Sequence, residues 1–205
     1  MVPSSHRRKI FLTALLSCFW LLALGFGLRS LFSYENTPGA TGKSPESWPT
    51  SSRIIRSADH YNLVMLAHPY CPCTRASVNE LAAIMAQTQG KLSAYVLFLK
   101  PENSSEGWAD TKLRRTAAAI PGVTTLTDLA GSEARRFGAE TSGHTLLFDP
   151  KGRRVFNGGI TASRGHAGGN AGESAIVALV NRGETGHSST FVFGCALTED
   201  KDAAN

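Results

Sequence analysis

Two cysteines separated by a single proline are the residues of this 205-residue chain best suited to chemistry. Cys71, Pro72 and Cys73 follow an apolar run at residues 63–67 and precede an amphipathic helix predicted over residues 75–87. The start of a helix offers unpaired backbone N–H groups and the positive end of the helix dipole, and both stabilise a thiolate. A thiolate attacks disulfides and binds soft metals, so the sequence predicts either redox chemistry or metal binding at this position.

The short spacing of the cysteines also bears on their redox behaviour. A disulfide between Cys71 and Cys73 would close a smaller ring than a pair with two intervening residues, so we expect it to be strained and easily reduced. Such a bond suits an oxidant or an isomerase better than a strong reductant.

Hydrophobic patterning predicts the elements that position this pair. The predicted strands cover residues 61–67, 91–99, 123–127, 144–149 and 153–157. The predicted helices cover residues 75–87, 108–120, 132–137 and 173–181. The turn Pro150-Lys151-Gly152 between the last two strands favours an antiparallel hairpin. The chain is therefore expected to fold as an α/β domain with a β-α-β half followed by a β-β-α half.

This order of elements, with the CxC pair at the start of the first helix, resembles the thioredoxin-like superfamily over residues 53–182. The resemblance implies a central mixed sheet and thiol-disulfide exchange at the cysteines. The chain departs from the family pattern at two places. One residue instead of two separates Cys71 from Cys73, and His144 stands where the family has a cis-proline before the first hairpin strand.

The segment from Gly143 to Gly152 is similar to the histidine segment of the Sco copper chaperones, which are membrane-anchored thioredoxin-like proteins. The resemblance implies a copper site made by Cys71, Cys73 and His144, and a metalloprotein as the acceptor of the metal. Thiolate and imidazole ligands suit copper or zinc by their softness. A loop histidine held by ordinary hydrogen bonds is the alternative interpretation of His144.

A glycine-rich loop over residues 158–172 follows the second hairpin strand. Because that strand returns toward the edge at which the first one begins, the loop is expected near Cys71. Its residues Arg164 and His166 are candidates to lower a thiol pKa or to contact a substrate. His68, at the end of the first strand, is a candidate for a supporting role beside the cysteines. For the glycine-rich loop itself, the alternative interpretation is a mobile surface loop without a role at the cysteines.

Cys195 lies in an apolar patch, residues 191–197, within an otherwise polar tail at residues 183–205. An extended chain from Asn181 to Cys195 covers roughly 45 Å at about 3.3 Å per residue, which is enough to return to the helix-start cysteines. Cys195 is therefore a candidate resolving thiol or fourth metal ligand, with an unpaired thiol or an intermolecular crosslink as the alternative. The CPC, SRGH and FGC segments are similar to those of small membrane-anchored bacterial proteins labelled RedB-like.

The N-terminal region predicts a membrane anchor. Residues 10–28 carry no charge and are long enough to span about 30 Å of hydrocarbon as a helix. Three basic residues precede this run and only Arg29 follows it, so residues 1–9 are expected in the cytoplasm and the domain outside. A cleaved signal peptide is the alternative, because the small residues at 23–25 have the spacing that a signal peptidase prefers. The Ser, Pro and Gly content of residues 29–52 predicts a flexible linker.

The net charge of +5 does not indicate a nucleic-acid partner. Four basic residues and no acidic residue lie before Glu35, which leaves 17 basic and 16 acidic residues in the exported part. The charge therefore reports membrane topology, and no basic patch for nucleic acid is predicted.

Two hypotheses follow from the sequence. The first is an inner-membrane, single-pass thiol-disulfide oxidoreductase whose domain faces the periplasm or the cell exterior, acts on protein thiols or disulfides and requires no cofactor. In it Cys71 attacks the substrate, and Cys73 or Cys195 resolves the mixed disulfide. The second is a copper-binding assembly factor that uses Cys71, Cys73 and His144 without catalytic turnover.

Overall fold

The computed structural model describes residues 4–184 and 186–197, so the predicted tail beyond residue 197 and the first three residues lie outside it. The chain divides between residues 37 and 38 into an N-terminal helix and a folded domain. Helix α1 spans Ser4–Asn36, and an 18-residue window within its His6–Asn36 part has a mean hydropathy of 2.1. By length and composition it is able to cross a membrane, as a predicted anchor or a signal segment requires.

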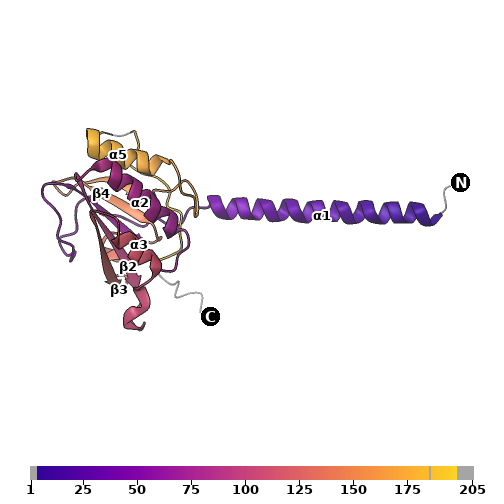
Figure 1. The fold of residues 1–205 in the computed structure, drawn as a ribbon, viewed down its shortest axis with the longest axis horizontal. Coiled ribbons are helices and arrows are strands. Elements are labelled where there is room, and N and C mark those ends of the chain that lie inside the picture. The colour runs from indigo at the N-terminus through magenta and orange to yellow at the C-terminus, as the bar shows by residue number, and fades with distance from the viewer. Residues whose placement is uncertain (1–3, 185, 198–205) are drawn as a thin grey trace. The chain divides into compact units, whose positions relative to one another are not determined.

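The first half of the domain is a β-α-β unit, as predicted (Figure 1). Strand β1 (Tyr61–Ala67), helix α2 (Thr74–Thr88) and strand β2 (Leu92–Lys100) follow one another, and β1 pairs with β2 in parallel. Strand β3 (Val123–Leu129) then pairs with β2, also in parallel. The cysteines follow the carboxyl end of β1, so they lie at the end of the sheet where these parallel strands finish.

The second half is a hairpin followed by a helix. Strands β4 (His144–Phe148) and β5 (Arg154–Gly158) are antiparallel, and α5 (Ala171–Arg182) follows. Strand β4 pairs antiparallel with β1, which gives the sheet order β3-β2-β1-β4-β5. Leu66 near the end of β1 lies opposite His144 at the start of β4. The chain before β4 therefore reaches the same edge of the sheet as the cysteines.

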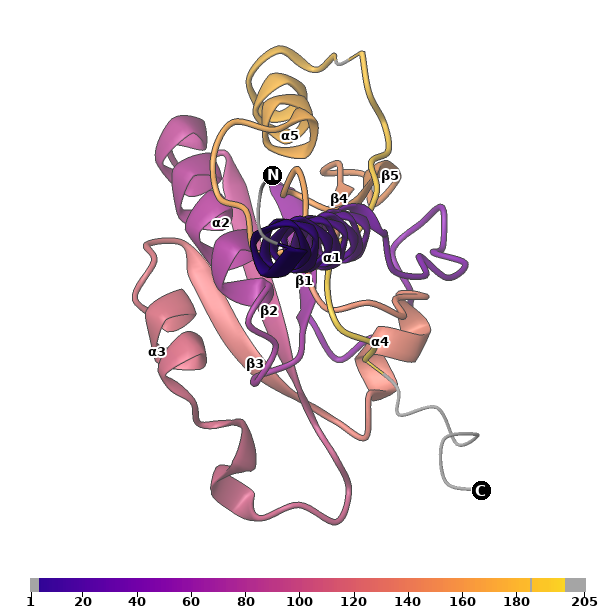
Figure 2. The same cartoon turned by 90° about the vertical axis from the view of Figure 1, so that its right-hand side faces the viewer.

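Alternating side chains of the strands build a core on each face of the sheet. Leu63, Met65 and Ala67 of β1 pack with α2 and α5, whereas Val64 and Leu66 face the opposite side. Helix α4 (Ser132–Arg136) covers that opposite side with Ala134 and with Phe137, the residue after it. Figure 2 shows α2, α3 and α5 apart from α4, with the strands between them.

The helix predicted over residues 108–120 is divided into two pieces. A 3₁₀ turn, η1 (Glu106–Ala109), is followed by α3 (Lys112–Ala118). The break has a local cause, because Thr111 adopts an extended conformation and its side chain accepts a hydrogen bond from the N–H of Arg114. Thr111 therefore begins a new helix where hydrophobic periodicity alone predicts a continuous one.

The linker predicted as flexible over residues 29–52 is instead helical up to Asn36 and then packs on the domain. Backbone hydrogen bonds of 2.8 Å join Gly39 N to Val192 O and Trp48 N to Gly152 O. The Trp48 ring stacks edge-on against Phe137 and Phe148, with centroids 5.4 and 5.1 Å away. The prediction rested on the polar composition of residues 29–52, which does not reveal this docking. One aromatic side chain and a few backbone hydrogen bonds are enough to hold the segment on the domain.

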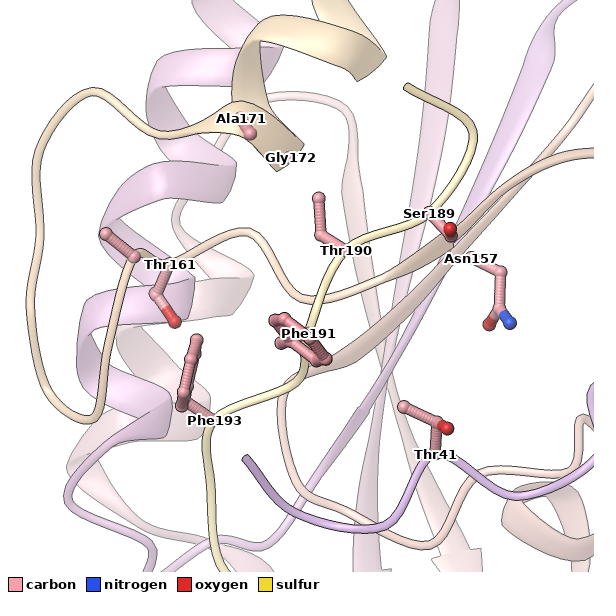
Figure 3. A pocket seen from close by; sticks show the side chains of 10 residues that line it. Thr41, Asn157, Thr161, Ala171, Gly172, Ser189, Thr190, Phe191 and Phe193 are labelled. Atoms are coloured by element: carbon pink, nitrogen blue, oxygen red, sulfur yellow. The ribbon is translucent and has the colours of Figure 1, made fainter. Parts of the chain in front are cut away.

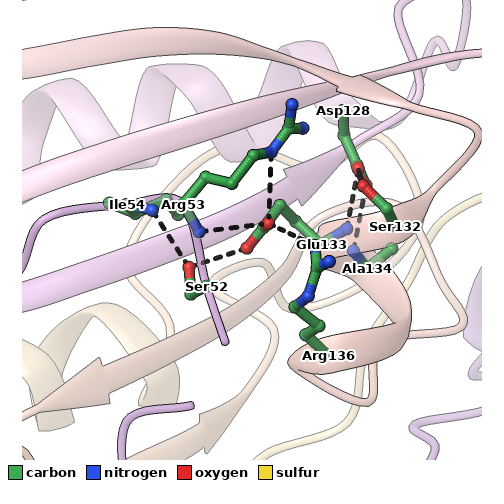
Figure 4. A network of polar contacts seen from close by, with 8 residues as sticks. All are labelled: Ser52, Arg53, Ile54, Asp128, Ser132, Glu133, Ala134 and Arg136. Atoms are coloured by element: carbon green, nitrogen blue, oxygen red, sulfur yellow. Dashed lines mark hydrogen bonds and ion pairs between the residues drawn. The ribbon is translucent and has the colours of Figure 1, made fainter. Parts of the chain in front are cut away.

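Buried carboxylates hold α4 and the chain before β1 in place (Figure 4). Glu133 accepts hydrogen bonds from Ser52 Oγ at 2.7 Å and Arg53 N at 3.3 Å, and it pairs with Arg136. Asp128, only 1% exposed, accepts from the backbone N–H groups of Glu133 and Ala134 at 2.8 and 2.9 Å. These contacts satisfy N–H groups at the first turn of a helix too short to be stable alone.

We expect Asp128→Ala to lower the free energy of unfolding by about 2 kcal/mol, because it leaves two buried N–H groups without acceptors. Urea unfolding followed by near-ultraviolet circular dichroism measures this change. Asp59→Ala, at an exposed aspartate, is the matched control and should change stability by less than about 0.5 kcal/mol. Equal effects of the two substitutions would show that Asp128 does not hold α4.

Candidate functional site

Cys71 and Cys73 lie in a helical turn between β1 and α2. Thr74 N donates to Cys71 O at 3.2 Å and Ala76 N donates to Cys73 O at 3.0 Å. Cys73 stands at the N-cap of α2 with helical backbone angles, φ −66° and ψ −33°. The two cysteines are 3% and 6% exposed, so both thiols lie under the surface at the positive end of the helix.

The C-terminal tail brings Cys195 to this turn. Its residues run beside β5, with Gly159 N donating to Phe191 O, and then cross to the loop before β4. There Ser142 N donates to Cys195 O at 2.8 Å, and the backbone N–H of Cys195 donates to Cys71 Sγ at 3.4 Å. Residues 124 positions apart in the chain are therefore in contact, as the length of the tail allows.

The glycine-rich loop brings Arg164 to the same place. Its guanidinium donates to Gly194 O at 2.5 Å, directly before Cys195. Helix α2 anchors the loop through Glu80, a buried carboxylate that accepts from Gly168 N at 2.7 Å and Asn170 Nδ2 at 3.1 Å. Arg164 therefore lies in the cysteine cluster as a fixed positive charge, whereas His166 of the same loop is exposed.

The environment of Cys71 favours its thiolate. Burial alone would raise the pKa of Cys71, but hydrogen bonds from Cys195 and from Thr74 outweigh burial and hold this pKa below that of an ordinary thiol. Both the side chain and the backbone N–H of each partner contribute. Cys71 is thus the member of the cluster best suited to nucleophilic attack.

The other two thiols are kept protonated. Burial, followed by the negative charge of Cys71, raises the pKa of Cys73, and Arg164 opposes the rise. Burial and the interaction with Cys71 raise the pKa of Cys195 to about 12, again against the charge of Arg164. Cys71 is therefore the member of the cluster that ionises most readily, and the other two thiols lie beside it.

His144 lies on the other face of the sheet. It shares a face of β4 with Leu146 and Phe148, and its Nε2 is 2.6 Å from Oδ1 of Asn157 on β5. Burial and the charge of Arg154 lower the pKa of His144, so the ring is neutral at neutral pH. With Nε2 donating to Asn157, the buried Nδ1 has no hydrogen-bond partner among the described residues.

Ser142 occupies the place beside the cysteine turn that the sequence predicts for His144. Its buried hydroxyl is 2.6 Å from Thr74 Oγ1 and accepts from His68 N at 2.7 Å. The sequence carries no signal for this role, because a loop serine before a strand is common and only the register of β4 places it. Ser142 thus joins the end of β1, the start of α2 and the tail.

A copper site requires Cys71, Cys73 and His144 to converge. Among residues 4–184 and 186–197, no group of three His, Cys, Asp or Glu side chains is arranged so that it could hold a metal ion. His144 points away from α2, so the side chains present do not fit a Cys₂His site. The copper hypothesis gains no support from this geometry, and it stays a prediction from sequence.

Aromatic side chains flank the cysteine turn. His68 stacks edge-on against Trp108 at 5.6 Å, and Tyr70 stacks against the same indole at 5.0 Å. His68 Nδ1 also accepts from Tyr70 N at 3.2 Å. His68 therefore contacts the turn through Tyr70, and the exposed Tyr70 borders the surface next to Cys71.

A cavity of about 630 Å³ lies between the start of α5 and the tail (Figure 3). Phe191 and Phe193 of the tail, Thr161 of the loop after β5 and Asn157, the partner of His144, are among its walls. No cysteine lines it. The cavity therefore adjoins the tail that carries Cys195 and is separate from the thiols.

Gly194 permits the close approach of the tail to Ser142. A Cβ atom at Gly194 would lie 2.0 Å from Ser142 O, so Gly194→Ala must displace the tail from the cysteine turn. We expect the pKa of Cys71 to rise in this variant, because Cys195 no longer donates to its sulfur. Ultraviolet absorbance of the thiolate, titrated against pH in the reduced protein, measures the change.

Gly186→Ala is the matched control, since nothing lies within 4 Å of a Cβ atom at that exposed tail glycine. It should leave the titration unchanged. An unchanged Cys71 titration in Gly194→Ala as well would show that Cys195 does not stabilise the thiolate.

Comparisons with known proteins agree with this architecture. The structure resembles crystal structures of an uncharacterized conserved protein from Geobacillus kaustophilus (TM-score 0.57, 16% identity) and a hypothetical protein from Sinorhizobium meliloti (TM-score 0.54, 18% identity). The matches cover 81% and 80% of this chain and 94% and 97% of those chains. The fold is thioredoxin-like. The predicted fold class, a mixed α/β domain preceded by one apolar helix, is thus confirmed.

Other comparisons are weaker. A secreted disulfide oxidoreductase from Mycobacterium tuberculosis matches with a TM-score of 0.42 and 11% identity over 60% of this chain and 81% of that chain. No family model matches the sequence, and no curated protein matches it either. What the thioredoxin-like domain does must therefore be argued from its own residues.

Proposed function

We propose that the protein is a membrane-tethered, extracytoplasmic thiol-disulfide oxidoreductase that acts on protein disulfides or thiols through Cys71. One observation carries this proposal: at the start of α2, the backbone N–H of Cys195 donates a hydrogen bond to Cys71 Sγ at 3.4 Å. This N–H, with Thr74, favours the thiolate that thiol-disulfide exchange requires. The thioredoxin-like fold agrees with such a function without establishing it.

The cluster supplies both parts of the exchange reaction. Cys71 attacks a substrate disulfide as thiolate, and one substrate sulfur leaves as thiolate, which yields a mixed disulfide. A second thiol of the same chain, Cys73 or Cys195, then attacks Cys71 Sγ and releases the other substrate sulfur. The reaction needs no cofactor, and its reverse transfers a disulfide to a substrate dithiol.

We also infer that α1 anchors the domain to the inner membrane with the N-terminus in the cytoplasm. The apolar span and the basic residues Arg7, Arg8 and Lys9 before it support this orientation. Protease added to intact spheroplasts should then digest the domain. Protection of the domain in intact spheroplasts, with digestion only after lysis, would contradict this orientation.

Reduction of insulin disulfides by dithiothreitol tests the catalytic proposal. The full-length protein in detergent should accelerate insulin precipitation at least about tenfold over the uncatalysed rate. Reactivation of scrambled ribonuclease tests the isomerase direction in parallel. If neither reaction exceeds its uncatalysed rate, the protein is not a thiol-disulfide oxidoreductase.

A further inference from the structure

The backbone at the CxC pair opposes a disulfide within it. Cys73 has helical angles, and successive hydrogen bonds from Thr74 N, Arg75 N and Ala76 N close the turn over residues 71–73. The thiols of Cys71 and Cys73 are close enough for a side-chain hydrogen bond, but side chains two positions apart on a helical turn do not face each other as a disulfide requires. A disulfide between Cys71 and Cys73 therefore requires this turn to unwind and the first hydrogen bonds that support α2 to break.

Cys195 approaches Cys71 from outside the helix. Its carbonyl accepts from Ser142 N at 2.8 Å, and Leu197 N donates to Glu140 O at 2.8 Å, so backbone contacts hold the tail on both sides of the thiol. The hydrogen bond with the Cys195 side chain is the largest of the contributions that lower the pKa of Cys71. A bond from Cys195 to Cys71 breaks no helical hydrogen bond.

We propose, on the basis of the oxidoreductase function above, that Cys195 is the resolving thiol and that the oxidised protein carries a Cys71–Cys195 disulfide. Cys195 loses its proton and attacks Cys71 Sγ of the mixed disulfide. The sulfur–sulfur bond to the substrate breaks, and the departing substrate sulfur keeps the electron pair and is then protonated. In total the substrate disulfide gains two electrons and two protons, the Cys71–Cys195 dithiol loses them, and Cys73 remains a thiol.

The electrostatics of the cluster put these steps in order. Burial and, while Cys71 is a thiolate, its hydrogen bond and charge raise the pKa of Cys195, which disfavours two neighbouring negative charges in the reduced cluster. Once Cys71 is in a mixed disulfide, that charge is gone, whereas Arg164 still favours deprotonation of Cys195. Cys195 therefore deprotonates more readily once Cys71 is in the mixed disulfide.

Access to Cys71 involves the same segment. Because Cys71 is only 3% exposed and the tail touches its sulfur, a protein disulfide must displace residues 194–197 to reach it. The contacts of Ser142 with Cys195 and of Arg164 with Gly194 re-form when the tail returns. Return of the tail places Cys195 against the mixed disulfide.

Mapping of the disulfide after one turnover tests the inference. Reduced full-length protein in detergent, carrying Cys18→Ser to remove the cysteine of α1, is mixed with insulin, quenched with acid, alkylated and digested without reductant. We expect a Cys71–Cys195 peptide pair in this protein and in its Cys73→Ser variant. In Cys195→Ser the mixed disulfide between Cys71 and an insulin chain should persist at least about tenfold longer.

A Cys71–Cys73 pair in the parent protein, or a short-lived mixed disulfide in Cys195→Ser, would overturn the assignment. Oxidation by glutathione disulfide, without insulin, separates this result from a failure of the proposed function. If insulin is not reduced but glutathione disulfide forms the Cys71–Cys195 bond, the pairing stands and the protein-reductase function fails. If insulin is reduced and the bond joins Cys71 to Cys73, the function stands and the inference fails.

Discussion

Cys71→Ser is expected to reduce insulin-reductase activity by more than about 100-fold, to the uncatalysed rate. Serine has nearly the size of cysteine, but its hydroxyl does not ionise near neutral pH and forms no disulfide. The variant should keep its fold, because the substitution leaves the backbone hydrogen bonds of residues 71–76 in place. Initial rates of insulin precipitation, with circular dichroism as the folding check, measure both properties.

Cys18→Ser is the matched control, since Cys18 lies in α1 outside the folded domain, and it should retain full activity. Activity of Cys71→Ser above about half that of the parent would place the nucleophile at another cysteine.

The pH dependence of the reductase rate should reflect the same thiolate. The pKa of Cys71 is lowered, so the rate rises with pH as Cys71 deprotonates and levels off before an ordinary thiol would ionise. Lowering the pH through this depressed pKa removes the activity, because the nucleophile is then a thiol. A rate that follows the ionisation of a free thiol would show that the hydrogen bonds to Cys71 do not act in solution.

Trp48→Ala is expected to lower the free energy of unfolding by about 2–3 kcal/mol. The half-buried indole contacts Phe137 and Phe148 at the core that α4 covers, and its removal exposes both phenyl rings. Urea unfolding of the full-length protein in detergent, followed by near-ultraviolet circular dichroism, measures the loss.

Trp48→Phe keeps an aromatic contact and should cost less than half as much. If Trp48→Ala has no effect on stability, residues 38–52 do not dock on the domain, and the flexible linker predicted from composition describes them correctly.

Much of the fold follows from local sequence patterns. The apolar run before Cys71, the amphipathic helix after Cys73 and the Pro150-Lys151-Gly152 turn each specify an element, and their order leaves few topologies. The arrival of the loop with Arg164 at the cysteines also follows, because an antiparallel hairpin returns to the edge at which it began. These patterns do not predict that the helix expected over residues 108–120 is divided at Thr111. There a helix cap interrupts a continuous helical spacing of apolar residues.

The roles of His144 and Ser142 depend on information that local patterns do not contain. A shift of one residue in the register of β4 would move every side chain of the strand to the other face. Only the pairing of His144 with Leu66 fixes the ring on the α4 face and leaves Ser142 beside Thr74. Likewise, the docking of Trp48 depends on a patch made by Phe137 and Phe148, which are distant in sequence.

The central claim is that Cys71 is the centre of a redox-active dithiol. The most direct test is to titrate the reduced Cys18→Ser protein in buffers with graded ratios of reduced to oxidised glutathione. Free thiols are counted at each ratio by alkylation and mass spectrometry. We predict a single two-electron transition in which two of the three cysteines of the domain become protected within one chain, and no such transition in Cys71→Ser. Three thiols that remain free at every ratio, or an intramolecular disulfide that still forms in Cys71→Ser, would contradict it.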